Sequence, residues 1–246
     1  MANVNKTSQN GKATEEQTDN LIEQMLAINV GRADYYRRLS SFYFKELTQA
    51  QLDALASQDF TSANGGDELI AIGYADMHSY LKKRNSATRQ DLAVDYAHTF
   101  LAAGNYETYA ATPFESVFVS EAGLLMQEPR DEVYKMYCEA HVQPDESLHV
   151  PEDHVSFEFQ FMAHLIEKLN CEIEKHNWDE ALRVAKTIEE FHKNHQLNWI
   201  DDLCDAIDDT CATRFYRGVA KITRGFVHMD TDVIADELEV LQDFAA

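Results

Sequence analysis

Glycine and proline are scarce in this chain, with only 9 Gly and 4 Pro among 246 residues. Folds rich in β-strands need many tight turns, and tight turns usually depend on these two residues. Leucine, alanine, glutamate, glutamine and methionine, which favour helices, are plentiful. The sequence therefore predicts an all-α protein, and its 45% content of hydrophobic residues is enough to build a substantial core.

Apolar residues recur at the spacing of amphipathic helices through most of the chain. In the first half this pattern predicts helices over 20–47, 67–81, 87–101 and 130–140. A further helix starts near Thr48, which can cap it. The first segment fits either two consecutive helices or one helix interrupted at Gly31. In the second half the pattern predicts helices over 152–175, 180–192, 196–209, 213–227 and 232–241.

A short polar stretch, HVQPDESLHVP at residues 141–151, holds two of the four prolines and is the best candidate for a linker. We predict an N-terminal helical subdomain over 20–140 and a C-terminal helical subdomain over 152–246, joined there by a hinge. Residues 1–19 are polar, lack the apolar core of a signal sequence and are predicted to form a disordered tail. Hinged subdomains can exchange between copies, so a monomer and a domain-swapped dimer both stay open.

The chain is strongly acidic, with 43 acidic against 21 basic residues and a net charge of −22. Such a charge is repelled by nucleic-acid phosphates and by anionic membrane surfaces, and it attracts a basic peptide or a basic partner surface. The alternative is that the charge only keeps the protein in solution. No stretch approaches the ~18 apolar residues of a membrane span. The four cysteines form no CxxC pair, and we predict a cytoplasmic protein without stable membrane insertion.

Charged residues also form two stripes at helical spacing in the second half of the chain. The acidic stripe consists of Asp201, Asp202, Asp205, Asp208 and Asp209, and the basic stripe on the next predicted helix of Arg214, Arg217, Lys221 and Arg224. The simplest interpretation is that the two adjacent helices complement each other or face solvent. The alternative is that the acidic face binds a basic ligand.

The segment PEDHVSFEFQFMAHL, residues 151–165, places a proline and three ionisable residues before an apolar run. Glu152, Asp153 and His154 are consecutive, so on a helix they point in different directions and cannot converge as a catalytic dyad. They suit a helix start, where proline and acidic residues are favoured. A metal pair of His154 and Glu158 lacks supporting ligands. We therefore predict no catalytic residue, no metal and no cofactor, with a small-molecule hydrolase using His154 as the less favoured alternative.

A long irregular segment, residues 102–123, contains four aromatic residues: Tyr106, Tyr109, Phe114 and Phe118. Loops of this length are usually functional or mobile. The alternative is that the rings cover the core from outside. Apolar grooves ringed by acids bind peptides that carry both hydrophobic residues and arginines. The aromatic segment and the acidic PEDH segment together favour a peptide-binding protein over an enzyme.

Four stretches of the chain also carry a family resemblance. They are DYAHTFLAAGNYETYAATPFESVFVSE (95–121), PEDHVSFEFQFMAHL (151–165), FHKNHQLNWIDDLCDAI (191–207) and TRFYRGVAKITRGFV (213–227). In this order they resemble motifs of the TorD/DmsD/NarJ-like family of redox enzyme maturation chaperones, over roughly residues 30–230. The combination of a PxxS motif with a PxDH motif is more specific than any one of the four.

The resemblance implies an all-helical TorD-like fold with a hinge just before the PxDH segment. It also implies a maturation chaperone that binds the twin-arginine signal peptide, and the apo-form, of the catalytic subunit of a molybdenum-containing oxidoreductase. Such a chaperone acts in the cytoplasm and delays export until the cofactor is inserted. The alternative within the family is a NarJ-like assembly factor for a molybdoenzyme subunit without export control.

The resemblance further implies which residues bind the peptide. Carried over by motif, they are Tyr96, Phe100, Pro113, Phe114, Ser116, Val117, Phe118, Pro151, Glu152, Asp153 and His154. Glu152 and Asp153 can pair with guanidinium groups, and the aromatic residues can pack against an apolar segment. Val150 departs from the pattern, because many relatives have Glu before the proline.

Overall fold

The computed structural model describes residues 4–58, 67–103 and 111–246, and side chains from residue 17 onward. Within these residues the chain forms ten α-helices and a short 3₁₀ helix, Glu146–Leu148, without β-strands. The α-helices are α1 (Val4–Phe44), α2 (Gln49–Ser57), α3 (Glu68–Leu81), α4 (Thr88–Phe100), α5 (Glu115–Val119), α6 (Glu128–Glu139), α7 (Val155–Glu174), α8 (Trp178–His195), α9 (Ile200–Thr210) and α10 (Arg214–Ala245). The predicted all-α fold is confirmed.

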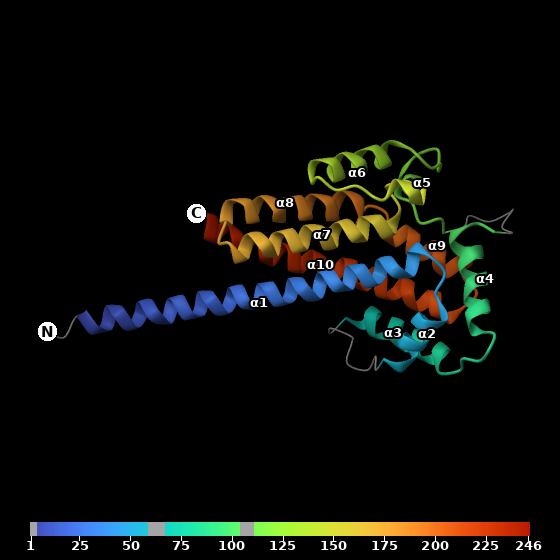
Figure 1. Cartoon of the computed structure of the whole chain (residues 1–246), viewed down its shortest axis with the longest axis horizontal. Coiled ribbons are helices and arrows are strands. Elements are labelled where there is room, and N and C mark those ends of the chain that lie inside the picture. The colour runs from blue at the N-terminus through green and yellow to red at the C-terminus, as the bar shows by residue number, and fades with distance from the viewer. Residues whose placement is uncertain (1–3, 59–66, 104–110) are drawn as a thin grey trace.

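Four long helices, α1, α7, α8 and α10, run along the long axis of the molecule (Figure 1). α1 packs on α7, α7 on α8, and α10 on both α8 and α3. α5 and α6 lie on the outer side of α7 and α8, and α4 closes the end of the bundle opposite the chain termini. None of the helices within the described residues is long and apolar enough to cross a membrane.

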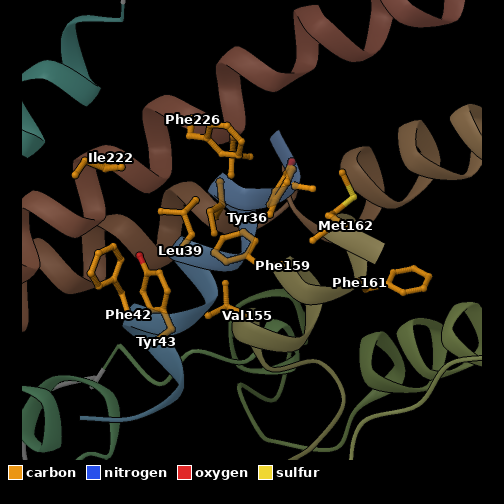
Figure 2. Close-up of a cluster of buried hydrophobic side chains, with 14 of the residues drawn as sticks. Tyr36, Leu39, Phe42, Tyr43, Val155, Phe159, Phe161, Met162, Ile222 and Phe226 are labelled. Atoms are coloured by element: carbon orange, nitrogen blue, oxygen red, sulfur yellow. The ribbon is translucent and has the colours of Figure 1, made fainter. Parts of the chain in front are cut away.

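The buried hydrophobic side chains form one cluster that takes members from both sides of the 141–151 segment. Figure 2 shows its centre, where Tyr36 of α1 lies between Phe159 of α7 and Phe226 of α10. The Tyr36 ring centroid is 5.8 Å from that of Phe159 and 4.9 Å from that of Phe226. This single core joins both halves of the chain. Its contacts do not test whether residues 141–151 act as a hinge, so the hinge and the two subdomains stay a prediction.

α1 is one unbroken helix, so both predicted alternatives, two consecutive helices and one helix interrupted at Gly31, are wrong. Glycine within a helix costs about 1 kcal/mol relative to alanine. The buried polar contacts of Asn29 and Arg32 on either side of Gly31 hold the helix in place. α1 begins at Val4, within the segment 1–19 for which we predicted a disordered tail. That tail stays a prediction.

α10 is also continuous, whereas the sequence predicted two helices with a break near residues 228–231. This stretch, HMDT, contains neither glycine nor proline, and Asp230 within it is buried. The contacts that Asp230 makes with α1 stabilise the helical conformation in the middle of α10.

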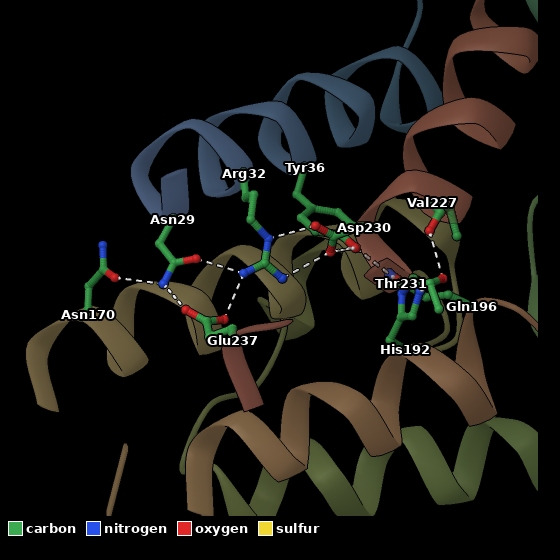
Figure 3. Close-up of polar contacts among 10 residues, drawn as sticks. All are labelled: Asn29, Arg32, Tyr36, Asn170, His192, Gln196, Val227, Asp230, Thr231 and Glu237. Atoms are coloured by element: carbon green, nitrogen blue, oxygen red, sulfur yellow. Dashed lines mark hydrogen bonds and ion pairs between the residues drawn. The ribbon is translucent and has the colours of Figure 1, made fainter. Parts of the chain in front are cut away.

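A buried polar network joins α1 to α10 (Figure 3). Arg32 Nε donates to Asp230 Oδ1 at 2.6 Å, and Arg32 Nη1 donates to Glu237 Oε2 at 2.9 Å. Asn29 Nδ2 donates to Glu237 Oε1 at 2.5 Å, and the Tyr36 hydroxyl donates to Asp230 Oδ2 at 2.8 Å. The network fixes the relative position of the two longest helices along their length.

The two charged stripes pair only in part. Arg224 of α10 contacts Asp201 at 3.0 Å and Asp205 at 2.5 Å, as the complementary interpretation of α9 and α10 predicts. Arg214 and Lys221 instead pair with one buried residue of α3, Asp76, at 2.7 and 2.5 Å. The sequence did not reveal this partner because α3 lies about 140 residues earlier in the chain.

Candidate functional site

The PFES segment, 113–116, and the PEDH segment, 151–154, lie against each other. The Glu115 N–H donates to the Asp153 carbonyl oxygen at 3.0 Å, and the Val155 N–H donates to the Pro113 carbonyl oxygen at 2.9 Å. Phe114 and His154 thereby form an isolated antiparallel bridge. The structure thus brings together the two motifs that sequence analysis selected separately.

His154 caps the N-terminus of α7, and its Nδ1 accepts a hydrogen bond from the Ser156 N–H at 3.1 Å. The ring also contacts Phe114 edge-on, with centroids 4.8 Å apart. Burial lowers the pKa of His154 to about 3, so the imidazole is neutral at physiological pH. The predicted helix start is confirmed, although α7 begins at Val155 rather than at residue 152.

Asp153 caps a different helix. The side chain is fully buried, and its Oδ2 accepts from the Ser116 N–H in the first turn of α5 at 2.9 Å. Its Oδ1 has no hydrogen-bond partner among the described residues. Burial is the main cause that raises the pKa of this carboxyl. Asp153 therefore positions the PFES loop on the start of α7, and its inner oxygen stays unpaired.

Glu152 forms the accessible acidic edge of the site and already binds a guanidinium. Arg130 of α6 donates from Nε to Glu152 Oε2 at 2.5 Å and from Nη2 to Oε1 at 2.7 Å. These hydrogen bonds, which Arg130 donates to Glu152, are the main cause that raises the pKa of Arg130. The Tyr137 hydroxyl also donates to the Glu152 carbonyl oxygen at 3.1 Å. The pair is partly exposed, with 22% of the Arg130 side chain and 19% of the Glu152 side chain accessible.

Behind this edge lie two further buried acids that sequence analysis did not select as site residues. Glu115 accepts from Asn198 Nδ2 at 2.6 Å, and its other carboxylate oxygen lies 3.0 Å from His195 Nδ1. Neither oxygen of Glu158 has a partner among the described residues, since the nearby Trp199 indole N–H donates to the His195 carbonyl oxygen. Glu158 was considered only as a metal ligand with His154. No group of metal-ligating side chains is placed to hold an ion in the described part of the chain.

Replacing Glu158 by glutamine is expected to stabilise the protein at pH 8. Burial, followed by the charges of Glu115 and Asp153, raises the pKa of Glu158 well above its usual range. The folded state therefore keeps a proton that the unfolded chain has already released, and stability falls as the pH rises above the ordinary carboxyl range. Glutamine has no proton to release, so the variant lacks this pH-dependent loss, which is about 1.4 kcal/mol for each pH unit over which only the folded state keeps the proton.

Urea unfolding of both proteins at pH 5, 6, 7 and 8 would measure this effect. We expect the difference between Glu158→Gln and the unmodified protein to grow with pH. Glu167→Gln, a change at an exposed acid of the same helix, serves as the control. Parallel pH profiles for Glu158→Gln and the unmodified protein would contradict the prediction.

The other predicted binding residues divide into two groups. Tyr96 and Phe100 of α4 are core residues: the Tyr96 hydroxyl donates to the Tyr43 carbonyl oxygen at 2.8 Å, and the Phe100 ring lies 5.3 Å from Tyr216. Pro113 and Ser116 are also buried. Phe114, Val117, Phe118 and Pro151 are partly exposed.

The aromatic segment therefore has two roles. Phe118 packs against Trp199, with ring centroids 5.5 Å apart, as expected if the rings cover the core. Phe114 packs on His154 and keeps part of its surface accessible. Tyr106 and Tyr109 lie outside the described residues, so the prediction for them stays a prediction.

A pocket of about 180 Å³ adjoins the acidic edge. Its wall is mostly apolar and comes from Tyr137 of α6, Val142 and Pro144 of the predicted linker, and Phe157 and Phe161 of α7. Two of these residues connect it to the PEDH segment: Tyr137 donates to the Glu152 carbonyl oxygen, and the Phe157 ring lies 5.8 Å from that of His154. Tyr137 and Phe157 thus join the hydrophobic cavity to the segment that carries the guanidinium-binding carboxylate.

Known proteins are similar to this chain over most of its length. The protein named chaperone protein TorD of Vibrio parahaemolyticus is 28% identical over 222 residues, which cover 88% of this chain and all of that protein. The TorD chaperone of Vibrio cholerae El Tor is 25% identical over 223 residues, or 89% of this chain and 98% of the relative. That of Photobacterium profundum is 28% identical over 232 residues.

A family model described as the nitrate reductase delta subunit matches residues 67–205. The match includes α3 to α8, most of α9, and both the PFES and the PEDH segments. It therefore covers more than half of the chain, including the site described above. The resemblance noted in the sequence is confirmed, and the chain belongs to the nitrate reductase delta subunit family, to which TorD-type chaperones are related.

Proposed function

We propose that this protein is a cytoplasmic maturation chaperone for a molybdenum-containing oxidoreductase. It binds the twin-arginine signal peptide of the apo catalytic subunit and delays export until the cofactor is inserted. Membership of the family and the TorD relatives, which are named chaperones, support the general role. The net charge of −22 favours a basic peptide as the ligand.

One observation supports the peptide proposal most directly. Glu152 binds the guanidinium of Arg130 in a bidentate contact, close to an apolar pocket. A carboxylate that binds one guanidinium in this geometry is suited to bind another. A signal-peptide arginine would replace Arg130 on Glu152, and a neighbouring apolar side chain would enter the pocket between Tyr137 and Phe157. Asp153 and His154 would act as positioning residues, since each is committed to a helix cap.

Replacing Arg130 by glutamine is expected to tighten peptide binding, because it removes the internal competitor for Glu152. Replacing Glu152 by glutamine is expected to weaken binding about tenfold, since a hydrogen bond to a charged group contributes about 1.5–3 kcal/mol. Calorimetric titration would compare a twin-arginine signal peptide from a molybdoenzyme encoded nearby with the same peptide carrying two glutamines.

Arg183→Gln supplies the matched control, because Arg183 also pairs with a glutamate, Glu180, but on the exposed surface of α8. It should leave binding unchanged. Equal affinity for the arginine and glutamine peptides would contradict the proposal. So would an Arg130→Gln variant that binds no better than the unmodified protein.

An assembly factor without export control is the second candidate, and the description of the family as a nitrate reductase subunit favours it. In that case the protein would bind the apo catalytic subunit whether or not its signal peptide is present. Copurification with the catalytic subunit from which the signal peptide has been deleted distinguishes the two. Retained binding would favour the assembly factor.

A further inference from the structure

A second groove lies on the other half of the bundle, between α1 and α10. Its volume is about 200 Å³. Its apolar wall consists of Leu21, Met25 and Ile28 on α1 and Val233 and Val240 on α10. On each helix these residues follow the spacing of one face, so the groove runs between two parallel apolar stripes. Leu21 and Ile28 are 39% and 52% exposed, which is high for large aliphatic side chains.

This groove is distant from the PEDH segment. Asn170, near the end of α7, donates to the Leu26 carbonyl oxygen at 3.1 Å and accepts from Asn29. His154 caps the start of the same helix, 16 residues earlier, which corresponds to about 24 Å of helix. In Figure 1 the C-terminal parts of α7 and α10 lie toward the chain termini, whereas α5 and the start of α7 lie toward the opposite end.

The α10 border of the groove is acidic, and neither α1 nor α10 supplies a compensating positive charge there. Residues 18–31 of α1 and 229–245 of α10 contain neither lysine nor arginine. The exposed carboxylates beside the groove are on α10, where Asp232, Asp236, Glu239 and Asp243 lie along one side of the two valines, and Asp236 lines the groove itself. Asp19 and Glu23 are two residues from Leu21 and therefore lie on the opposite face of α1. Arg32, the first basic residue beyond this part of α1, is buried and neutralised by Asp230 and Glu237. The groove thus has an apolar floor with a row of negatively charged residues along its α10 side.

The buried polar network beneath the groove also fixes the shape of the groove. Asn29 and Glu237, which line it, belong to the buried network that fixes α1 against α10 (Figure 3). A partner would therefore meet a preformed surface and would not have to order it on binding.

We propose that this groove binds a basic amphipathic helix of a partner protein. A groove between two helices accepts the apolar face of a third at spacings of three and four residues. Lysine and arginine on the flank of that helix nearer to α10 would face the acidic border. A second copy of this chain is disfavoured as the occupant, because two acidic borders would then come together at a net charge of −22 per chain.

The test uses a helical peptide with leucines on one face and lysines and arginines on both flanks, beside the same peptide with glutamates on its flanks. We expect the full-length protein to bind the basic peptide and not to bind the acidic one. The double variant Leu21→Ser, Ile28→Ser should lose about tenfold in affinity, equivalent to about 1.4 kcal/mol. Asp236→Lys should also weaken binding and should reduce its dependence on salt.

Val94→Ser is the matched control, since Val94 is 64% exposed on α4, far from the groove in the chain. Glu152→Gln separates this proposal from the preceding one: it should leave binding of the basic helical peptide unchanged. Loss of this binding in Glu152→Gln, or undiminished binding by the Leu21→Ser, Ile28→Ser variant, would overturn the groove proposal. So would light scattering that shows a dimer which this double variant abolishes, because the occupant would then be a second copy.

Discussion

Replacing Arg32 by methionine is expected to lower the free energy of unfolding by about 3–5 kcal/mol, the usual cost of removing one member of a buried ion pair. Arg32 is only 5% exposed and is bound to both Asp230 and Glu237, which are 1% and 7% exposed. Methionine has a similar length and no charge. The variant would therefore keep most of the packing and leave two buried carboxylates without their counter-charge.

Guanidinium chloride unfolding at pH 7 would measure the loss. Arg183→Met removes an exposed pair with Glu180 and is expected to change the free energy of unfolding by less than about 1 kcal/mol. Arg32→Lys keeps the charge but loses the planar guanidinium group that binds both carboxylates. We therefore expect an intermediate loss in the free energy of unfolding. If Arg32→Met cost no more than Arg183→Met, the network would not hold α1 on α10.

Replacing Gly218 by alanine is expected to lower the free energy of unfolding by about 3 kcal/mol, at the upper end for overpacking of a core. Gly218 of α10 faces Gly73 of α3 where the two helices cross. A Cβ atom on Gly218 would lie 2.6 Å from the Gly73 carbonyl oxygen and 2.8 Å from Met77 Cγ. A backbone oxygen cannot move aside as a side chain can, so the two helices would have to separate.

Gly31→Ala is the matched comparison, because a Cβ atom there meets nothing within 4 Å. Gly31 is exposed in the middle of α1, so the same substitution should stabilise the protein by up to about 1 kcal/mol. Thermal unfolding of both variants would thus show shifts of opposite sign. A Gly218→Ala variant as stable as Gly31→Ala would show that α3 and α10 do not need this close approach.

Most helices were predictable because their signals are local. Thr48 caps α2 through a hydrogen bond from the Gln51 N–H, and Asp67 caps α3 through one from the Ile70 N–H. Each contact spans three residues, so the sequence contains both partners side by side. The continuity of α1 and α10 was not predictable, since it depends on Asn29, Arg32 and Asp230, whose partners lie in distant segments.

The candidate site likewise combines features that were predictable from the sequence with features that were not. The PEDH segment was predictable as a helix start, because capping depends on neighbouring residues. Arg130 was not selected, although it follows Pro129 at the start of α6, because nothing in the local pattern pairs it with Glu152. The contact of Glu115 with His195 joins residues 80 positions apart and had no sequence signal.

The sequence by itself determined the helical class, the approximate helix positions and the acidic character of the surface. These follow from composition and from periodicity within four residues. Only the tertiary structure decided that Asp153 caps α5, that Glu158 is buried without a partner, and that two apolar cavities border acidic edges. The physical reason is that these features come from side chains of different helices, and packing alone sets the distances between them.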